Sequence, residues 1–363
     1  MKHLGRLATA IMLAINLITI GLLLFAAYSP NVDPELHPLR ACMGLTFPVF
    51  LVFNACFLIF WLIFRYRLAL VPLIGILLCA SQIRTYMPIN FRTSNVPDEA
   101  IKILSYNVMA FGDLRKTAGK NPVLDYLKDS GADIICLQEY TVTPNRKYVT
   151  KENIEKALKA YPYKHIEQIG SKGSSNGVAC YSKYPILRTK RVDYASNSNG
   201  SILYEIAVGK DTITLINNHL ESNKLTALDK EVYEGMIAAP EADKVKKGVW
   251  HLLQKLGDAQ QIRAVQARAV AEEVKKSRYP YIIVCGDFND SPISYAHKTI
   301  SQELDDAFRS SGCGLGISYN QNKFYFRIDN MLISKNLKAY NCTVDRSIKS
   351  SDHYPIWTYV ARR

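Results

Sequence analysis

Residues 281–289 have the sequence YIIVCGDFN, an apolar run that ends in Gly286, Asp287 and Asn289. The run is short and rich in β-branched side chains, so it predicts a buried strand that ends at a polar loop. Asp287 and Asn289 stand two residues apart, so both side chains face the same side of an extended segment. One of them would hold a metal ion or polarise water while the other orients it. A surface turn is the alternative, because Gly, Asp and Asn favour turns.

The same arrangement, an apolar run with a polar end, occurs twice upstream. Residues 134–138 (IICLQ) precede Glu139, and residues 101–106 (IKILSY) precede Asn107. A carboxylate at the end of a buried strand is a suitable Mg²⁺ ligand. Taken singly, Glu139 is more often an ordinary surface glutamate and Asn107 the first residue of an Asx turn. The three strand ends together favour a metal site.

Two histidines have settings that suit acid–base chemistry. His353 follows Asp352 directly, and a histidine beside a carboxylate acts as a base or as an acid that contacts phosphate. A hydrogen-bonded loop histidine is the alternative. Asp329 is placed to bond to His353 and fix its tautomer. His219 follows residues 214–218 (TLINN) and would also point into a cleft at the strand ends.

The chain after residue 100 mixes many strands with few helices. It lacks the regular strand–helix alternation of a doubly wound sheet, so two packed mixed sheets flanked by helices fit better. The predicted helices cover residues 121–130, 151–160 and 258–276, and the predicted strands cover residues 101–107, 133–138, 177–182, 186–192, 201–208, 212–219, 281–285, 325–334, 337–344 and 354–360.

Residues 221–257 are too many for a plain connection between a strand and a helix. Their charged, helix-prone composition predicts a helical insertion beside the site. The insertion would cap the substrate, or it would be a solvated pair of surface helices.

The first 87 residues predict a transmembrane region of three helices. Residues 7–32 and 41–64 contain no charged side chain, and each run exceeds the ~20 residues that a helix needs to cross a bilayer. Residues 68–83 form a shorter third run. Residues 88–99 then form a polar linker, and residues 100–363 form the catalytic domain. Buried core helices of a soluble fold are the alternative for the apolar runs.

The few basic residues of this region predict its orientation. Lys2 and Arg6 at the amino terminus, and Arg65 and Arg67 in the second loop, mark these two segments as cytoplasmic. Three spans then place the catalytic domain outside the cytoplasm, whereas two would place it inside. The prediction is an integral protein of the inner (cytoplasmic) membrane with the catalytic domain outside.

The charge of the chain favours an anionic partner. The chain has a net charge of +13, and the part after residue 88 keeps +9 from 39 Lys+Arg and 30 Asp+Glu. Such a balance suits nucleic acid, phosphorylated lipid headgroups or an anionic membrane face. Solubility alone is the alternative, because the charges are dispersed. The eight cysteines show neither a disulfide framework nor zinc-ligand spacing.

Six polar segments resemble one known family. They are, in order, SYN at 105–107, LQE at 137–139, NNHL at 217–220, GDFN at 286–289, RID at 327–329 and SDH at 351–353. This pattern resembles the endonuclease/exonuclease/phosphatase superfamily of deoxyribonuclease I-like nucleases, inositol polyphosphate phosphatases and sphingomyelinases. Residues 177–186 also resemble a recurrent family segment. The resemblance covers residues 101–363 and excludes the membrane region.

The resemblance implies a four-layer α/β sandwich and a Mg²⁺-dependent phosphoesterase, with Mn²⁺ as an alternative ion. Glu139 would be the principal metal ligand, with Asn107 beside it and Asp352 completing the metal site.

The resemblance also implies catalytic roles. Asp287 would orient or deprotonate the attacking water, aided by Asn289. His353, paired with Asp329, would contact the scissile phosphate or act as the base. His219 would stabilise phosphate oxygens or protonate the leaving group.

The expected function is a membrane-anchored phosphoesterase that cleaves a phosphodiester or phosphomonoester. Its substrate would be nucleic acid, or a phospholipid or inositol phosphate headgroup, and membrane lipid would be a further partner. No protein partner is inferred. One departure from the family pattern is Asn330, which stands where an aromatic residue is common, so no specific subfamily is implied. The alternative is a catalytically silent, membrane-attached binding or scaffold module of the same fold.

Overall fold

Two six-stranded mixed sheets pack face to face in the computed structural model of the chain. The structure describes all residues except 1, 117–119, 171–175, 225–228, 230–241 and 322–324. In spatial order, the first sheet contains β11 (Leu337–Val344), β12 (Ile356–Arg362), β1 (Ile101–Asn107), β2 (Ile134–Gln138), β4 (Asn176–Ser182) and β3 (Tyr163–Ile169). The second contains β5 (Ile186–Arg191), β6 (Gly200–Val208), β7 (Asp211–His219), β8 (Tyr281–Asp287), β10 (Asp329–Ser334) and β9 (Leu304–Asp306).

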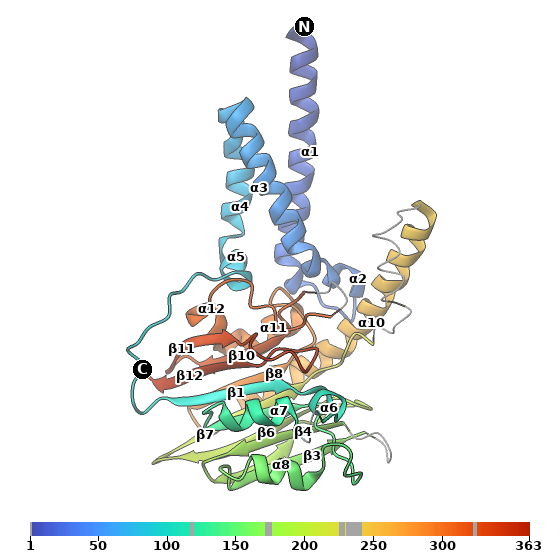
Figure 1. Cartoon of the computed structure of the whole chain (residues 1–363). Helices are drawn as coiled ribbons and strands as arrows, with labels where there is room; N and C mark the ends of the chain where they lie inside the picture. The colour runs from blue at the N-terminus through green and yellow to red at the C-terminus, as the bar shows by residue number, and fades with distance from the viewer. Residues whose placement is uncertain (1, 117–119, 171–175, 225–228, 230–241, 322–324) are drawn as a thin grey trace.

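Helices cover the outer faces of both sheets (Figure 1). The first sheet carries α6 (Met109–Asp113), α7 (Pro122–Asp129) and α8 (Lys151–Ala157), and the second carries α10 (Ala242–Lys275), α11 (Tyr295–Ile300) and the short η4 (Ser301–Glu303). Helix α12 (Ala307–Ser311) instead contributes Ala307 and Phe308 to the core between the two sheets. Helix α7 is capped at its amino end by Asn121, whose side chain accepts a hydrogen bond from the Leu124 amide. This arrangement confirms the predicted pair of mixed sheets flanked by helices.

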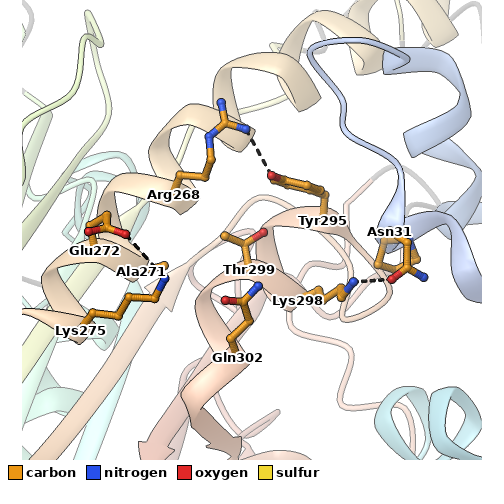
Figure 2. Close-up of a pocket in the computed structure, with 10 residues that line it drawn as sticks. Asn31, Arg268, Ala271, Glu272, Lys275, Tyr295, Lys298, Thr299 and Gln302 are labelled. Carbon is orange, nitrogen blue, oxygen red and sulfur yellow. Dashed lines mark hydrogen bonds and ion pairs between the residues drawn. The ribbon is translucent and has the colours of Figure 1, made fainter.

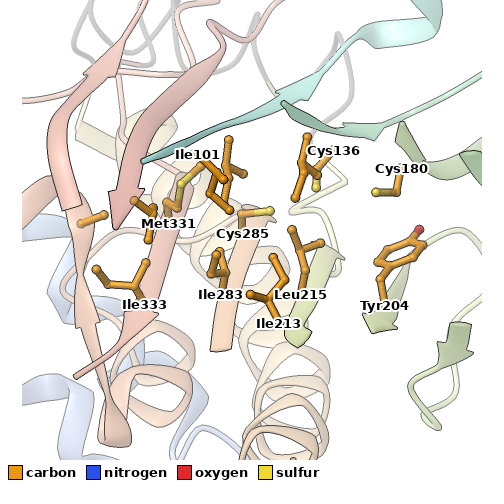
Figure 3. Close-up of a cluster of buried hydrophobic side chains, with 14 of the residues drawn as sticks. Ile101, Cys136, Cys180, Tyr204, Ile213, Leu215, Ile283, Cys285, Met331 and Ile333 are labelled. Carbon is orange, nitrogen blue, oxygen red and sulfur yellow. The ribbon is translucent and has the colours of Figure 1, made fainter. Parts of the chain in front are cut away.

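The central core lies between the two sheets (Figure 3). Alternate residues of each strand face inward, so Ile103 and Cys136 from the first sheet meet Leu215, Ile283 and Met331 from the second, all of them fully buried. The eight cysteines are free thiols, and those in this core pack as small apolar residues.

Some predicted boundaries differ from those of the structure. The predicted strand 325–334 begins only at Asp329, because Phe326 instead bridges back to Tyr319. Helix α10 begins at Ala242 and therefore crosses the predicted insertion boundary at residue 257. The rest of the predicted insertion lies largely outside the described residues. Strand β3 was not predicted, because its sequence YKHIEQI is mostly polar, as suits the edge position that it occupies.

Two parallel strand pairs set the position of the polar strand ends. Strands β1 and β2 run parallel and align Asn107 with Gln138, next to Glu139. Strands β7 and β8 also run parallel and align His219 with Asp287. Parallel strands end at the same edge of a sheet, so both pairs present their polar ends on one side of the sandwich.

The amino-terminal region forms a helical bundle that projects from the sandwich (Figure 1). Its elements are α1 (Lys2–Tyr28), η1 (Ser29–Asn31), α2 (Pro38–Ala41), η2 (Cys42–Thr46), α3 (Phe47–Phe64), η3 (Tyr66–Ala69), α4 (Leu70–Leu78) and α5 (Ala80–Tyr86). Within the described residues, Gly5–Asn31 and Pro38–Phe64 are long and apolar enough to cross a membrane. The segments Tyr66–Leu78 and Ala80–Tyr86 make a third candidate if this pair, bent by 61°, is one span.

Polar side chains join the two long helices inside the bundle. The Asn16 amide donates to Asn54 Oδ1 at 3.3 Å, and Trp61 Nε1 donates to Asn16 Oδ1 at 3.0 Å. All three residues are buried, while most apolar side chains of α1 and α3 face outward. A buried polar contact with an apolar exterior is the arrangement that a lipid environment favours.

The bundle is docked onto the sandwich. Phe47 packs with Ile293, and a Cβ atom on Gly44 would lie 1.9 Å from the Ile293 carbonyl oxygen, so glycine is required there. Figure 2 shows the neighbouring junction, where Lys298 of α11 donates to Asn31 at the end of η1. The predicted linker also lies along the domain, since the Asn90 amide donates to the carbonyls of Arg309 and Gly312.

Candidate active site

The two sheets meet at a polar centre formed by their strand ends. Asn107 ends β1 and donates its amide to Glu139 Oε1 and to Asp287 Oδ2, both at 3.1 Å. The bond to Asp287 links the first sheet to the second, whereas the bond to Glu139 joins two neighbouring strand ends of the first sheet. The Asn107 amide oxygen accepts from the Met109 backbone amide at 3.1 Å. Asn107 therefore fixes the distance between the two carboxylates.

His219 is buried beside the same two carboxylates. Its Nε2 lies 3.7 Å from Glu139 Oε1 and 3.9 Å from Asp287 Oδ2. Burial lowers the pKa of His219 even though Asp287 opposes the shift. The neutral imidazole is thus favoured near pH 7, and this form can donate or accept a hydrogen bond.

His353 has the opposite electrostatic setting. Its Nδ1 lies 2.8 Å from Asp329 Oδ2, and its Nε2 lies 3.7 Å from Asp287 Oδ2. Burial alone would lower the pKa of His353, but the carboxylates of Asp329 and Asp287 raise it well above its ordinary value. This shift favours the imidazolium form, whose Nε2 lies on the side of Asp287.

Asp287 has the properties of a base. Burial raises the pKa of this carboxyl to about 6, against the opposing charge of His353. The Asn289 backbone amide donates to Oδ1 at 2.8 Å, and the Asn289 side-chain amide lies 3.3 Å from Oδ2. Asp287 is thus held rigidly and ionises close to neutral pH.

The backbone around these residues adopts left-handed conformations. Glu139 has φ 53° and Asn289 has φ 52°, and such values are uncommon for residues other than glycine. Gly286 has φ 125°, and a Cβ atom there would lie 2.0 Å from the Asn218 carbonyl oxygen. The backbone is therefore strained at the positions where the chain directs these side chains toward one another.

A cavity of about 360 Å³ opens at this centre. Five of the eight predicted site residues line it: Glu139, Asp287, Asn289, Asp352 and His353. The other three, Asn107, His219 and Asp329, are buried and contact the lining residues. The structure therefore brings all eight predicted residues together. Ser351 supports Asp352 and Asn107, since its hydroxyl lies 3.4 Å from Asp352 Oδ1 and donates to the Asn107 carbonyl at 2.8 Å.

The cavity wall also contains polar residues that the sequence analysis missed. Arg263 of α10 is buried, with Nε 3.3 Å from Asp290 Oδ2 and Nη1 2.9 Å from Asn223 Oδ1. The ring of Tyr319 packs against His353, with 5.2 Å between the ring centroids. Asp290 directly follows the GDFN segment, which was a usable signal. Nothing in the spacing of α10 distinguished Arg263 from its exposed neighbours.

The side chains at the centre suit a divalent cation. Among the described residues, the ligand atoms of Asp287, Asp329 and His353 all lie within 4.8 Å of one another. However, the Asp329–His353 hydrogen bond already explains part of that closeness. The Glu139 side chain is 32% exposed and faces the cavity, and Asp329 Oδ1 is buried with no hydrogen-bond partner in the described part of the chain. Hard carboxylate oxygens of this kind fit Mg²⁺ or Mn²⁺.

Sequence comparisons match the two regions of the chain separately. The profile of the Endonuclease/Exonuclease/phosphatase family matches residues 104–353. A family described as a domain of unknown function matches residues 9–86. No curated protein matches the chain.

Several solved structures share the fold at low sequence identity. D. rerio TDP2 complexed with a single-strand DNA product has a TM-score of 0.50 and 15% identity, over 73% of this chain and 100% of that one. The human Nocturnin catalytic domain with bound sulfate has a TM-score of 0.50 and 13% identity, over 76% and 97%. An endonuclease/exonuclease/phosphatase from Beutenbergia cavernae has a TM-score of 0.50 and 14% identity, over 72% of each chain. These similarities establish the fold of the catalytic domain.

Proposed function

The chain belongs to the endonuclease/exonuclease/phosphatase family, and we propose that it is a membrane-anchored, Mg²⁺-dependent phosphoesterase. Family members of this type are metal-dependent hydrolases of phosphoric esters. The observation that supports the proposal most is the convergence of Glu139, Asp287 and His353 on one cavity from distant parts of the sequence. A silent relative would have no need to keep this complete set of polar groups.

Glu139 would hold the metal ion, with Asn107 beside it and Asp352 completing the set. Bound Mg²⁺ supplies positive charge that stabilises the phosphate oxygens as negative charge develops on them. Mn²⁺ would serve the same purpose. The one-third exposure of the Glu139 side chain toward the cavity supports its role as the principal ligand.

The remaining residues would act on the water and the phosphate. Asp287, with a pKa raised by burial to about 6, would take the proton of the attacking water, and Asn289 would hold the carboxylate in place. Asp329 keeps His353 protonated, which favours contact with the phosphate over action as the base. His219 is neutral and would donate a hydrogen bond to a phosphate oxygen.

Two features bear on the substrate. The fold is shared with D. rerio TDP2, whose structure contains a single-strand DNA product, and this supports nucleic acid. The apolar helices of residues 1–87 support a phospholipid or inositol phosphate headgroup, because they would hold the site near a membrane. The proposed substrate is thus a phosphodiester or phosphomonoester of one of these two kinds.

The proposed location is the inner membrane, with the catalytic domain outside the cytoplasm. The outward-facing apolar side chains of α1 and α3 support membrane insertion. The basic residues Arg65 and Arg67 support a cytoplasmic position for the loop between the second and third spans. A reporter enzyme that is active only outside the cytoplasm, fused after Met87, tests the orientation.

Hydrolysis of bis(p-nitrophenyl) phosphate by the purified full-length chain tests the proposed activity. We expect turnover that needs Mg²⁺, stops with a chelator, and falls at least about a hundredfold in Glu139→Ala and in His353→Ala. Glu155→Ala is the matched control, because Glu155 is an exposed glutamate that pairs with Lys164.

Activity retained in both site variants would rule out the proposed mechanism. A folded protein inert toward this reporter, DNA, RNA, phosphoinositides and sphingomyelin would favour the silent scaffold.

A further inference from the structure

One wall of the active-site cavity is apolar. Leu45 from η2 and Leu252 and Leu256 from α10 line the same cavity as Glu139 and His353. All three leucines are half-buried and so remain accessible at its surface. A hydrolase that recognised only a phosphate and its polar neighbours would gain nothing from exposing three aliphatic side chains here, because exposed apolar surface is unfavourable in water. The wall therefore indicates a substrate with an apolar part.

Leu45 also places the cavity near the membrane surface. Helix α3 has 18 residues and hence a length of about 27 Å, close to the ~30 Å thickness of the hydrocarbon core. If α3 spans the bilayer, its first residue, Phe47, lies at the interface on the side of the catalytic domain. Leu45 is two residues away, within about 7 Å along the chain. If the span begins instead at Pro38, Leu45 lies within it.

Residues 288–294, which join β8 to α11 and are called the catalytic loop because they include Asn289, are fixed to the bundle at this same point. Ile293, four residues after Asn289, packs with Leu23 and Phe47 of the long helices. The backbone of Gly44 touches the Ile293 carbonyl so closely that no side chain fits between them. On the other side, Pro38 of α2 packs against Gly257 of α10. The membrane segment, the catalytic loop and α10 thus enclose the cavity together.

The charged groups of the cavity argue against a nucleic-acid groove. Binding of a nucleic-acid backbone relies on lysine and arginine side chains that are free to neutralise phosphates. Two such residues occur among the described residues of the lining. Lys224 Nζ lies 2.6 Å from Glu221, and Arg263 Nε lies 3.3 Å from Asp290, so each is already paired with a carboxylate. The polar end of the cavity is therefore suited to one phosphate group.

We propose that the substrate is a phospholipid of the membrane in which the protein is anchored. This inference rests on the proposed phosphoesterase function. The phosphate of the lipid would lie against Glu139 and His353, and the glycerol and first acyl carbons would lie along Leu45, Leu252 and Leu256. In the reaction the oxygen of water forms a bond to phosphorus, and one ester P–O bond breaks with its electron pair on the leaving oxygen. One water proton passes to Asp287, and the leaving oxygen gains a proton overall.

The test uses the full-length protein in vesicles of phosphatidylcholine that contain phosphatidylglycerol, phosphatidylethanolamine and phosphatidylinositol. Loss of each lipid phosphodiester is followed with Mg²⁺ present, in parallel with cleavage of bis(p-nitrophenyl) phosphate and of single-strand DNA. We expect at least one of the lipids to be cleaved. We also expect the ratio of lipid to reporter turnover to fall about tenfold in the double variant Leu252→Ser, Leu256→Ser. Leu45→Ser, which changes the cavity wall on its membrane side, should also lower the ratio of lipid to reporter turnover.

The matched control is the double variant Ile262→Ser, Val265→Ser on the same helix. These side chains are 38% and 44% exposed and lie outside the cavity lining, so the ratio should stay at the wild-type value. A variant that fails to fold loses both activities, whereas the proposal requires a change in their ratio.

Cleavage of DNA or the reporter without any lipid cleavage would overturn the inference and leave the phosphoesterase function intact. An unchanged ratio in the leucine variants would also overturn it. Absence of every activity would instead overturn the proposed function itself.

Discussion

The two histidines of the site differ in charge because their neighbours differ. His353 lies between the carboxylates of Asp329 and Asp287, and this raises its pKa. His219 lies 3.7 Å and 3.9 Å from the carboxylates of Glu139 and Asp287, without a carboxylate as close as Asp329 is to His353, and burial lowers its pKa. The sequence identified both histidines but left each with two possible roles. The choice between roles depends on distances that are set only when the two sheets pack together.

The rate of hydrolysis should depend on pH through Asp287. Burial raises the pKa of this carboxyl to about 6, and only its ionised form can accept a proton. The value of kcat/KM for bis(p-nitrophenyl) phosphate should therefore fall about tenfold per unit as the pH is lowered below about 6. A profile at saturating Mg²⁺ between about pH 4.5 and 8 checks this. A rate that stays flat down to pH 5 would show that a different group activates the water.

The strands and loops explain how the site is assembled. The apolar runs before Asn107, Glu139 and Asp287 predicted these strands and their ends, because a short run of apolar, β-branched residues marks a buried strand. The order in which the strands pair was not predictable, since periodicity specifies which face is buried and not which strand is the neighbour. The strand-end residues were found because each follows a recognisable strand. Arg263 was missed, because it reaches the cavity from helix α10.

Gly286, near the end of β8, should tolerate no side chain. In Gly286→Ala the new methyl group would meet the Asn218 carbonyl oxygen at 2.0 Å, and φ 125° would be strained for alanine. We expect a loss of about 3 kcal/mol or more in the free energy of unfolding, together with loss of activity. Thermal unfolding of the purified protein measures the loss.

The matched control for this change is Gly209→Ala. Gly209 also has a positive φ, of 61°, but no atom lies within 4 Å of its Cβ position. It should lose only about 1 kcal/mol, from backbone strain. If the two alanine variants were equally stable, steric contact with Asn218 would not be the reason that glycine is needed at position 286.

At the scale of the whole molecule, the helical bundle and the catalytic domain share an interface. Phe47 and Leu23 of the bundle bury Ile293 of the catalytic loop. The apolar runs 7–32 and 41–64 were evident in the sequence, because long uncharged segments are distinctive. Their docking on the loop was not evident, since neither Gly44 nor Ile293 carries a local signal of contact.

Widening this interface should impair the reaction. In Gly44→Ala the added Cβ would lie 1.9 Å from the Ile293 carbonyl oxygen, so the catalytic loop or the bundle must shift. A shift of about 1 Å at reacting groups costs up to about a hundredfold in rate, so we expect turnover to fall at least about tenfold. Gly21→Ala in α1 is the control, because nothing lies within 4 Å of its Cβ position. Equal turnover in both variants would show that the interface does not position the loop.

Binding of Mn²⁺ to the purified full-length protein, followed by electron paramagnetic resonance, tests most directly whether these distant segments form one metal centre. We predict that the wild type binds Mn²⁺ in competition with Mg²⁺, and that Glu139→Gln weakens binding at least about tenfold. Glu155→Gln, at an exposed pair with Lys164, should bind Mn²⁺ as the wild type does. Unaltered Mn²⁺ binding in Glu139→Gln, or no binding by the folded wild type, would contradict the account.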